Sequence, residues 1–199
     1  MGRSIYNLAI NSIGYGEIFD VKGFLEPDSH ALDGFNGYPP ILSDDANYVI
    51  CEDDVFTCSI GDVQKKVKIC EFLKNKGAHF LTLVHNNSSI GMNSRIGDGT
   101  IIDEGVHLDP DVKIGENCLI QTFAIIGHDS VIGNYSRIDS QCALVGGTVV
   151  GERATLYTQA MINHNVIIED DAVVGACSFV IKKVKSGTTV FGVPAKTIF

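Results

Sequence analysis

Aliphatic residues recur at every sixth position over about half of the chain. From Val84 to Val180, each sixth residue is valine, isoleucine or leucine, at seventeen positions in succession without a slip. The residue four places after each of them, from Ser88 to Val184, is small or β-branched. An amphipathic helix would repeat at 3.6 residues and a strand at two, so neither explains a period of six. A parallel β-helix does, because each six-residue unit forms one short strand with its corner and three units complete a coil.

This period divides the chain into two predicted parts. Residues 84–199 are expected to form the β-helix with a C-terminal loop, its large aliphatic side chains filling the interior and its small residues fitting the corners. Residues 1–83 lack the period and mix helical and extended patterns, which predicts a separate small α/β domain.

Local signals place the secondary structure within residues 1–83. A helix is expected over 63–75, with Asp62 as its N-cap and Gly77 as its C-cap. It lies between two apolar runs, and strand, helix, strand in succession predicts a βαβ unit with a small parallel sheet. The other elements expected here are a helix over 4–13 and strands over 19–26, 55–60 and 79–84.

Composition narrows the classes of partner. The net charge is −9, which argues against binding to the phosphates of a nucleic acid and against binding to an anionic bilayer. No run reaches 18 apolar residues and no signal peptide opens the chain, so we expect a cytoplasmic protein without a membrane partner. The six cysteines lack any C-x-x-C spacing, which predicts small core residues rather than a zinc site or a disulfide framework.

A column of residues eighteen apart singles out one corner of the coil. His128 and His164 fall in this column two coils apart, roughly 10 Å at the usual strand spacing, and Gly146 lies between them. Because Gly146 is followed by Gly147, no side chain fills the gap. His128 precedes Asp129, a pair that fits a general base with its tuning carboxylate, a metal ligand with its supporting group, or a solvated turn. The column predicts a ligand site at this corner.

Four short motifs add a family resemblance. GFLEPD at 23–28, SIGD at 59–62, GHD at 127–129 and GVPAK at 192–196 accompany the hexapeptide repeats. Together they resemble a family of sugar acetyltransferases that joins a small Rossmann-like domain to a β-helix, including sialic-acid O-acetyltransferases and bacillosamine-pathway N-acetyltransferases. The resemblance implies a mainly β fold with a left-handed parallel β-helix. It also implies a role in polysaccharide biosynthesis, in which acetyl-CoA acetylates an amino or hydroxyl group of a sugar or nucleotide-sugar without a metal.

The resemblance also implies roles for individual residues. His128 would be the general base, and Asp129 would hold its tautomer and raise its basicity. Backbone N–H groups near Gly146 would face the oxyanion. Acetyl-CoA would lie in the groove between neighbouring β-helices of a homotrimer, whose exposed apolar side chains include Phe123, Ile125 and Met161. The expected cofactor contacts are Arg137, Gly146, Thr158, Ala176 and Lys196, and the expected substrate contacts are Gln121, Gly61 and Asp62.

The beginning of the chain departs from the family pattern. MGRSIYNLAI looks like the end of a glycine-rich loop followed by its helix, and the strand that should precede the loop is missing. We therefore expect acetyl-CoA to bind and nucleotide-sugar affinity to be weak, which calorimetry would measure.

Two other functions remain open at this point. The γ-class carbonic anhydrases share the repeat and ligate zinc with histidines two coils apart, which would use His128 and His164 with Glu169 at the third position. A β-helix without catalytic activity could also act as an assembly module. Measuring bound zinc distinguishes the first alternative, while the acceptor sugar and the choice between N- and O-acetylation stay open.

Overall fold

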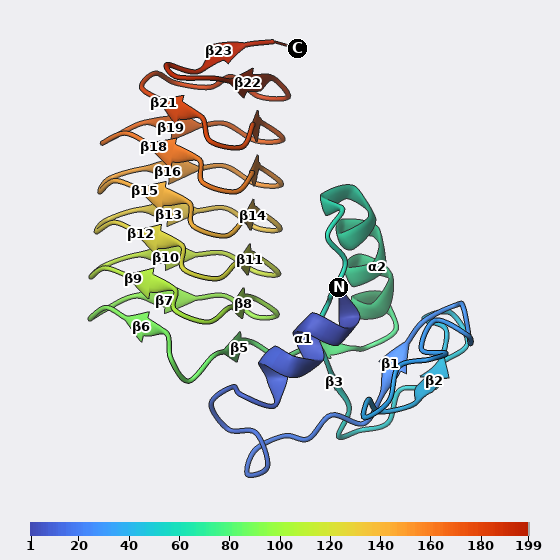
Figure 1. Cartoon of the computed structure of the whole chain (residues 1–199). Coiled ribbons are helices and arrows are strands. Elements are labelled where there is room, and N and C mark those ends of the chain that lie inside the picture. The colour runs from blue at the N-terminus through green and yellow to red at the C-terminus, as the bar shows by residue number, and fades with distance from the viewer. Residues whose placement is uncertain (199) are drawn as a thin grey trace.

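The protein is described from a computed structural model, which covers residues 1–198. Figure 1 shows a tall column of short strands with a smaller helical part against its lower half. The helices are α1 (Gly2–Ala9) and α2 (Val63–Asn75). The strands are β1 (Phe24–Leu25), β2 (Ile41–Ser43), β3 (Val55–Phe56), β4 (His79–Phe80), β5 (Leu83–Val84), β6 (Ser89–Ile90), β7 (Arg95–Ile96), β8 (Ile101–Ile102), β9 (His107–Leu108), β10 (Lys113–Ile114), β11 (Leu119–Ile120), β12 (Ile125–Ile126), β13 (Val131–Ile132), β14 (Arg137–Ile138), β15 (Ala143–Leu144), β16 (Val149–Val150), β17 (Thr155–Leu156), β18 (Met161–Ile162), β19 (Ile167–Ile168), β20 (Val173–Val174), β21 (Phe179–Val180), β22 (Thr189–Phe191) and β23 (Lys196–Thr197).

The column is a parallel β-helix with three sheets. Within residues 1–198 the sheets run β19-β16-β13-β10-β7, β21-β18-β15-β12-β9-β6 and β23-β22-β20-β17-β14-β11-β8-β5. Paired residues are eighteen apart, as in Ile126 opposite Leu144 and Leu144 opposite Ile162. These registers confirm the mainly β fold class and the coil of three hexapeptides that the period predicts.

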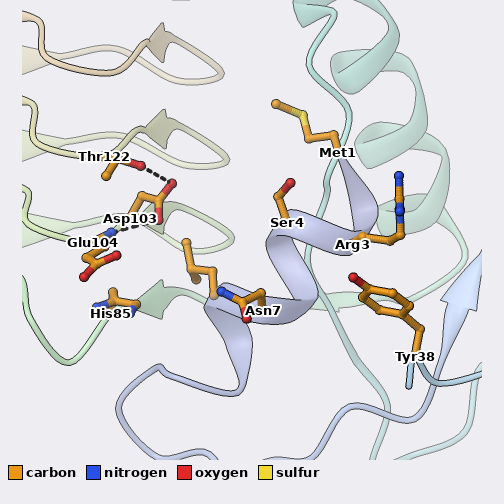
Figure 2. Close-up of a pocket in the computed structure, with 10 residues that line it drawn as sticks. Met1, Arg3, Ser4, Asn7, Tyr38, His85, Asp103, Glu104 and Thr122 are labelled. Atoms are coloured by element: carbon orange, nitrogen blue, oxygen red, sulfur yellow. Dashed lines mark hydrogen bonds between the residues drawn. The ribbon is translucent and has the colours of Figure 1, made fainter. Parts of the chain in front are cut away.

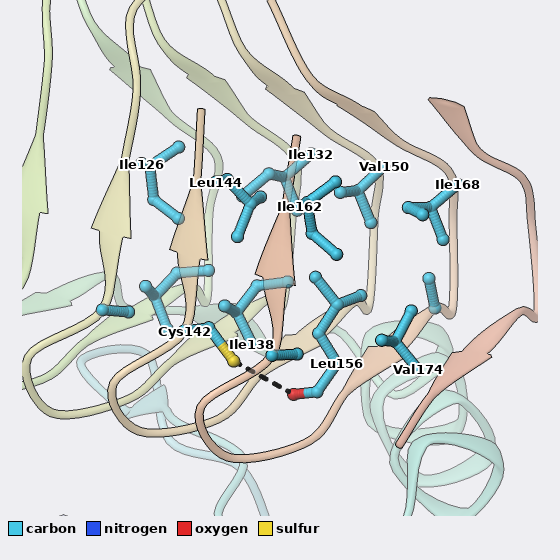
Figure 3. Close-up of a cluster of buried hydrophobic side chains, with 14 of the residues drawn as sticks. Ile126, Ile132, Ile138, Cys142, Leu144, Val150, Leu156, Ile162, Ile168 and Val174 are labelled. Atoms are coloured by element: carbon cyan, nitrogen blue, oxygen red, sulfur yellow. Dashed lines mark hydrogen bonds between the residues drawn. The ribbon is translucent and has the colours of Figure 1, made fainter. Parts of the chain in front are cut away.

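The repeating aliphatic residues form the interior of the β-helix. The fourteen from Ile102 to Val180 are at most 4% exposed, and Figure 3 shows several of them stacked in facing rows. The prediction that all seventeen would be interior is wrong for the first three, because they belong to the terminal coil of the column. Ile90 is 40% exposed there, and Val84 and Ile96 are only partly buried.

Each corner contains one residue in the left-handed region. From Asn93 to Cys177 every sixth residue has a positive φ, and among them only Gly99, Gly105 and Gly147 are glycines. An L-residue adopts this conformation at some cost, which Asn and Asp tolerate better than most others. The corners therefore depend on tertiary stacking, with Asp129 at φ 59° as one instance.

The predicted βαβ unit is present. β3 pairs in parallel with β4, and α2 connects them over the predicted residues. The Asp62 carboxylate caps α2 by accepting a hydrogen bond from the Lys65 N–H at 2.8 Å. The C-cap residue is Lys76 rather than Gly77, which follows it with φ 93° and continues the turn.

The other boundaries in this part were predicted too long. α1 ends at Ala9 rather than at residue 13, because the next segment bonds to the β-helix instead. The Ile13 N–H donates to the Val84 carbonyl at 2.9 Å. The strand expected over 79–84 divides into β4 and β5, since Leu81 donates to Phe56 and Leu83 to Thr100, on two different sheets. The strands expected over 19–26 and 55–60 shorten to β1 and β3, whose partners β2 and β4 are themselves two or three residues long.

Polar contacts dock α2 along the column. Gln64 Nε2 donates to Asp171 Oδ1 at 3.2 Å, and Lys74 Nζ donates to Glu116 Oε2 at 2.9 Å. These contacts lie near the two ends of α2, so the helix is held against several coils, as Figure 1 shows. α1 instead packs apolar side chains on the outer face of the first coils, through Ile5, Leu8 and Ala9 against Leu83, Ile101 and Leu119. Neither helix within residues 1–198 has the length and apolar character needed to span a bilayer.

The stacked core gives a direct test of inward and outward positions. Ile168 is fully buried, whereas its neighbour Ile167 is 41% exposed. We expect Ile168→Ala to lower the free energy of unfolding by about 2–5 kcal/mol, because it leaves a cavity in the interior. Ile167→Ala should lower it by less than Ile168→Ala does, because it leaves no cavity in the interior. Urea denaturation of both variants measures the difference, and equal losses would contradict the assignment of faces.

Candidate functional site

The corner between β12 and β13 holds the His128–Asp129 pair. Asp129 is the left-handed corner residue, so the chain turns sharply directly after His128. His128 Nδ1 lies 2.7 Å from Asp129 Oδ2, and the two side chains are 59% and 68% exposed. Because a carboxylate accepts hydrogen bonds, this contact favours the tautomer with the proton on Nδ1. Nε2 then has a free lone pair and can accept a proton.

Gly146 lies directly against the His128 ring. A β-carbon at residue 146 would lie 2.5 Å from His128 Nε2, so only glycine leaves room for the imidazole in this position. The Gly146 N–H makes no hydrogen bond within residues 1–198, whereas the next N–H, of Gly147, donates to the His128 carbonyl at 2.8 Å. The corner thus places a basic nitrogen beside a free backbone donor, which is the pair of groups that acyl transfer needs.

The carboxylates around His128 favour its protonated form. The hydrogen bond to Asp129 is the main cause that raises the pKa of His128 above its ordinary value. Slight burial acts in the opposite direction, and the charges of Asp129 and Asp109 add to the rise. The imidazole is therefore a stronger base than free histidine.

The third predicted zinc ligand is engaged elsewhere. Glu169 pairs with Lys183 at 2.5 Å and accepts a hydrogen bond from the Ser186 N–H at 3.0 Å. The Lys183 contact is the main reason that the pKa of Glu169 lies below its usual range. His164 is exposed two coils from His128, as the column predicts. Within residues 1–198, no three histidine, cysteine or acidic side chains are grouped so that they could hold a metal ion.

Arg137 joins the two parts of the chain. Its guanidinium pairs with both oxygens of Asp139, at 2.5 and 3.0 Å, and its Nη1 donates to the Gly61 carbonyl at 3.0 Å. This hydrogen bond brings together Arg137, which is an expected cofactor contact, and Gly61, which is an expected substrate contact. Asp62 is already used as the cap of α2.

The remaining predicted contacts lie at other corners. Gln121 follows β11 and accepts a hydrogen bond from Ser140 Oγ at 3.2 Å. Thr158 and Ala176 are eighteen residues apart, so they lie in one column at another corner of the coil. Lys196 lies in β23, paired opposite Phe191 of β22. Within one chain the six-stranded sheet separates these corners from His128. The structure therefore unites His128, Asp129 and Gly146, while Gln121, Thr158, Ala176 and Lys196 stay predictions.

A pocket between α1 and the lower coils was missed by the sequence analysis. Its volume is about 510 Å³, and Figure 2 shows α1 and Tyr38 on one side and the coil residues on the other. Asp103 accepts hydrogen bonds there from Thr122 Oγ1 at 3.0 Å and from the Glu104 N–H at 2.8 Å. The residues that line the pocket include Arg3, Tyr38, Asp103 and Glu104.

The six-residue period of the sequence could have identified part of this pocket. Adding eighteen to Asp103 gives Gln121 and then Asp139, so one column of the β-helix presents polar groups towards the α/β part. The same addition that selected His128 would have selected this column. The contributions of α1 and Tyr38 follow from tertiary packing and have no such local pattern.

The contact between His128 and Asp129 gives a testable prediction for the pKa of His128. We expect Asp129→Asn to lower the pKa of His128, because the variant removes the main group that raises it. NMR titration of the His128 ring protons, assigned with a His128→Gln variant, measures the change. The matched control is Asp33→Asn, which removes a carboxylate 3.0 Å from another exposed histidine, His30, and should leave the pKa of His128 unchanged. An unchanged His128 pKa in Asp129→Asn would show that Asp129 does not act on the ring.

Three solved bacterial structures share this fold. The acetyltransferase domain of PglB from Neisseria gonorrhoeae FA1090, in complex with acetyl coenzyme A, is 23% identical, covers 99% of this chain and 94% of its own, and has a TM-score of 0.89. PerB from Caulobacter crescentus, in complex with CoA and GDP-perosamine, is 27% identical over 80% of this chain and 79% of its own, with a TM-score of 0.75. WeeI from Acinetobacter baumannii AYE is 22% identical over 88% and 85%, with a TM-score of 0.61. PglB and WeeI show the fold, while the perosamine N-acetyltransferase from Caulobacter crescentus, 27% identical over 80% of this chain, confirms the resemblance to sugar acetyltransferases.

Sequence comparison gives a family for the β-helix. No curated protein matches the chain. The sequence pattern of the GMPPB C-terminal domain matches residues 75–177, from the end of α2 through most of the coils. Since the match spans more than half of the chain, the protein belongs to the GMPPB C-terminal domain family.

Proposed function

We propose that the protein transfers the acetyl group of acetyl-CoA to an amino or hydroxyl group of a sugar or nucleotide-sugar. The observation that carries this proposal is the corner where His128 Nε2, oriented by Asp129, lies against Gly146. The CoA and GDP-perosamine bound to PerB, which is 27% identical, support the same class of reaction.

The corner supplies the two groups that the reaction needs. His128 Nε2 accepts the proton of the acceptor amine or hydroxyl while that group attacks the thioester carbonyl. The Gly146 N–H donates to the oxyanion that forms on the carbonyl oxygen. When the carbon–sulfur bond breaks, the thiolate of CoA takes up the proton held on His128. Asp129 keeps the ring orientation through all of these steps, since it holds the Nδ1 proton.

The pocket beside α1 lies on the other side of the six-stranded sheet from His128 of the same chain, so we infer that it serves the His128 corner of a neighbouring chain as the acceptor part of the proposed site. Asp103 and Glu104 place two carboxylates in it, and Arg3 and Tyr38 line the opposite wall. Carboxylates attract a protonated amino group, while an arginine suits a phosphate or another anion. The lining therefore fits an acceptor with a cationic amino sugar and an anionic group, as in a nucleotide-linked amino sugar.

The His128 corner lies between two faces that expose apolar side chains. On the six-stranded sheet Ile125 and Met161 are 49% and 48% exposed, and on the five-stranded sheet Val149 and Ile167 are also exposed. A soluble chain that exposes apolar side chains on two adjoining faces is suited to self-association. We infer a homotrimer in which neighbouring β-helices cover these faces, with acetyl-CoA in the groove beside His128.

The general base is tested by removing its imidazole. His128→Ala should lower turnover roughly 10²–10⁴-fold, the usual contribution of a general base, because the acceptor keeps its proton. CoA release is measured with nucleotide-linked amino sugars, beginning with GDP-perosamine, and calorimetry checks acetyl-CoA binding. His30→Ala removes a histidine that is also exposed and paired with an aspartate, so its turnover should not change. Near-wild-type turnover in His128→Ala would contradict the proposed role.

The homotrimer is tested by solution mass. Light scattering of the wild-type chain should give three times the 21.4 kDa of one chain. Ile125→Asp places a charge on an apolar face and should lower this mass, whereas Val49→Asp, at a position 80% exposed in the α/β part, should not. A stable wild-type monomer at micromolar concentration would contradict both the trimer and the shared groove.

A further inference from the structure

Three buried hydroxyl groups at corners of the β-helix share one bonding pattern. Ser94, Thr100 and Ser136 each donate to the carbonyl group fifteen residues further on, at 2.9, 2.7 and 2.7 Å. Each also accepts a hydrogen bond from the N–H group eighteen residues further on. In this pattern a corner hydroxyl joins its own coil to the next coil along the column.

Thr148 departs from this pattern at the corner beside His128. Its side chain has no exposed surface, and its Oγ1 lies 2.5 Å from the carbonyl oxygen of Val145, three residues earlier. The carbonyl oxygen of Asn163, fifteen residues further on, is 3.5 Å away, so the hydroxyl proton is donated to Val145. The Thr148 side chain therefore closes a turn within its own coil instead of joining two coils.

The Val145 carbonyl is also the acceptor that the pattern would give to Ser130. Ser130 lies fifteen residues before Val145 and has no exposed surface. Its Oγ has no hydrogen-bond partner in the part of the chain that the structure describes, although buried hydroxyls are usually paired. Two buried hydroxyls thus belong to one carbonyl group, and Thr148 is the one that donates to it.

The Val145 carbonyl and the Gly146 N–H belong to the same peptide group. Because a peptide group is planar, a hydrogen bond that fixes its carbonyl also fixes the direction of its N–H. A peptide group whose oxygen accepts a hydrogen bond is also polarised, which makes its N–H a stronger donor. The Thr148 hydroxyl therefore acts on both the direction and the strength of the Gly146 N–H.

The neighbouring groups hold this turn and leave the Gly146 N–H open. The Gly146 carbonyl accepts a hydrogen bond from the Asn165 N–H at 3.2 Å, and the Gly147 N–H donates to the His128 carbonyl at 2.8 Å. A β-carbon at residue 127 would lie 2.5 Å from the Gly146 nitrogen, so Gly127 leaves that nitrogen uncovered. The turn is thus fixed around one donor that stays free to meet a ligand.

We propose that Thr148 is a positioning residue for acetyl transfer, whose hydroxyl orients and polarises the peptide group that presents the Gly146 N–H to the oxyanion. This role rests on the proposed function, in which that N–H donates to the thioester carbonyl oxygen. Because its side chain is fully buried, Thr148 acts through Gly146 and not by contact with acetyl-CoA. The negative charge on the carbonyl oxygen develops in the transition state, so Thr148 should affect kcat rather than KM.

An amide spectrum tests the hydrogen bond without any turnover. The chain contains three Val–Gly peptide groups, at 145–146, 150–151 and 174–175. Valine labelled with ¹³C at its carbonyl and glycine labelled with ¹⁵N therefore give three signals in an HNCO spectrum. Thr148→Val should shift mainly the Gly146 signal, because the peptide group loses the hydrogen bond to its oxygen. A Val145→Ile variant removes this signal and so assigns it.

The same spectrum contains its own controls. Gly151 and Gly175 donate to carbonyl groups of the next coil, so their signals should stay in place. Ser130→Ala removes the other buried hydroxyl and should shift the Gly146 signal less than Thr148→Val does. An unmoved Gly146 signal in Thr148→Val, or a larger shift in Ser130→Ala, would overturn the assignment of Thr148 as the donor.

Turnover of acetyl-CoA with GDP-perosamine tests the effect on the reaction. Thr148→Val should lower kcat about tenfold with KM nearly unchanged, less than the roughly 10²–10³-fold lost when an oxyanion donor is removed outright. Thr148→Ser keeps the hydroxyl and should retain most of kcat. Thr100→Val removes an equivalent buried hydroxyl at another corner and should keep the wild-type kcat. A wild-type kcat in Thr148→Val, or an equal loss in Thr100→Val, contradicts the positioning role.

Two further comparisons separate this role from the proposed function. Loss of turnover in His128→Ala but not in Thr148→Val would contradict only the role of Thr148, whereas near-wild-type turnover in His128→Ala would contradict the proposed function. Valine already occupies the same corner position at residues 112 and 166, so Thr148→Val should fold. The wild-type chain also decides by itself, since acetyl-CoA should shift the Gly146 signal more than the Gly151 and Gly175 signals. Equal shifts at saturation would overturn the role of this N–H.

Discussion

The hydrogen-bonded stacking of one coil on the next is the constraint on which the rest of this structure depends. Each strand donates and accepts along the column, so a residue always meets the residue eighteen places further on, as Ile126 meets Leu144. An interior position must therefore suit its neighbours above and below as well as those within its coil. The same constraint places the His128 ring over residue 146, where only a glycine leaves space for it.

This constraint explains which features could be predicted from the sequence. Positions in the column follow from addition along the chain, so the fold class, the fourteen interior residues from Ile102 to Val180 and the juxtaposition of His128 with Gly146 were predictable. The end of α1 was not, because it depends on a bond between Ile13 and Val84 that no local pattern indicates. Arg137 illustrates the same limit, since its partner Gly61 lies 76 residues earlier. The predicted contacts at Thr158, Ala176 and Lys196 belong to the groove of the proposed homotrimer and remain predictions.

The junction of the two parts differs in chemistry from the β-helix interior. The interior is a column of aliphatic side chains, which specifies little beyond size and shape. The junction instead uses directional polar contacts, from Gln64 to Asp171, from Lys74 to Glu116 and from Arg137 to Gly61. Directional contacts fix the position of α2 along a column whose coils otherwise repeat, so polar groups select one register among similar ones. The buried Lys66 belongs to this set, since its Nζ donates to the Asn117 carbonyl at 3.2 Å.

The exposure of His128 would connect the proposed acetyl transfer to the proposed homotrimer. In a single chain its ring is 59% exposed, and Asp129 holds its pKa above the ordinary value, so more of the base is protonated near neutral pH. A neighbouring β-helix that covers this corner would exclude water, and burial lowers the pKa of a histidine. The two effects act on the pKa of His128 in opposite directions. In the proposed homotrimer, the Asp129 carboxylate would therefore hold the ring in place and favour its protonated form, while the interface would favour the neutral form that accepts a proton.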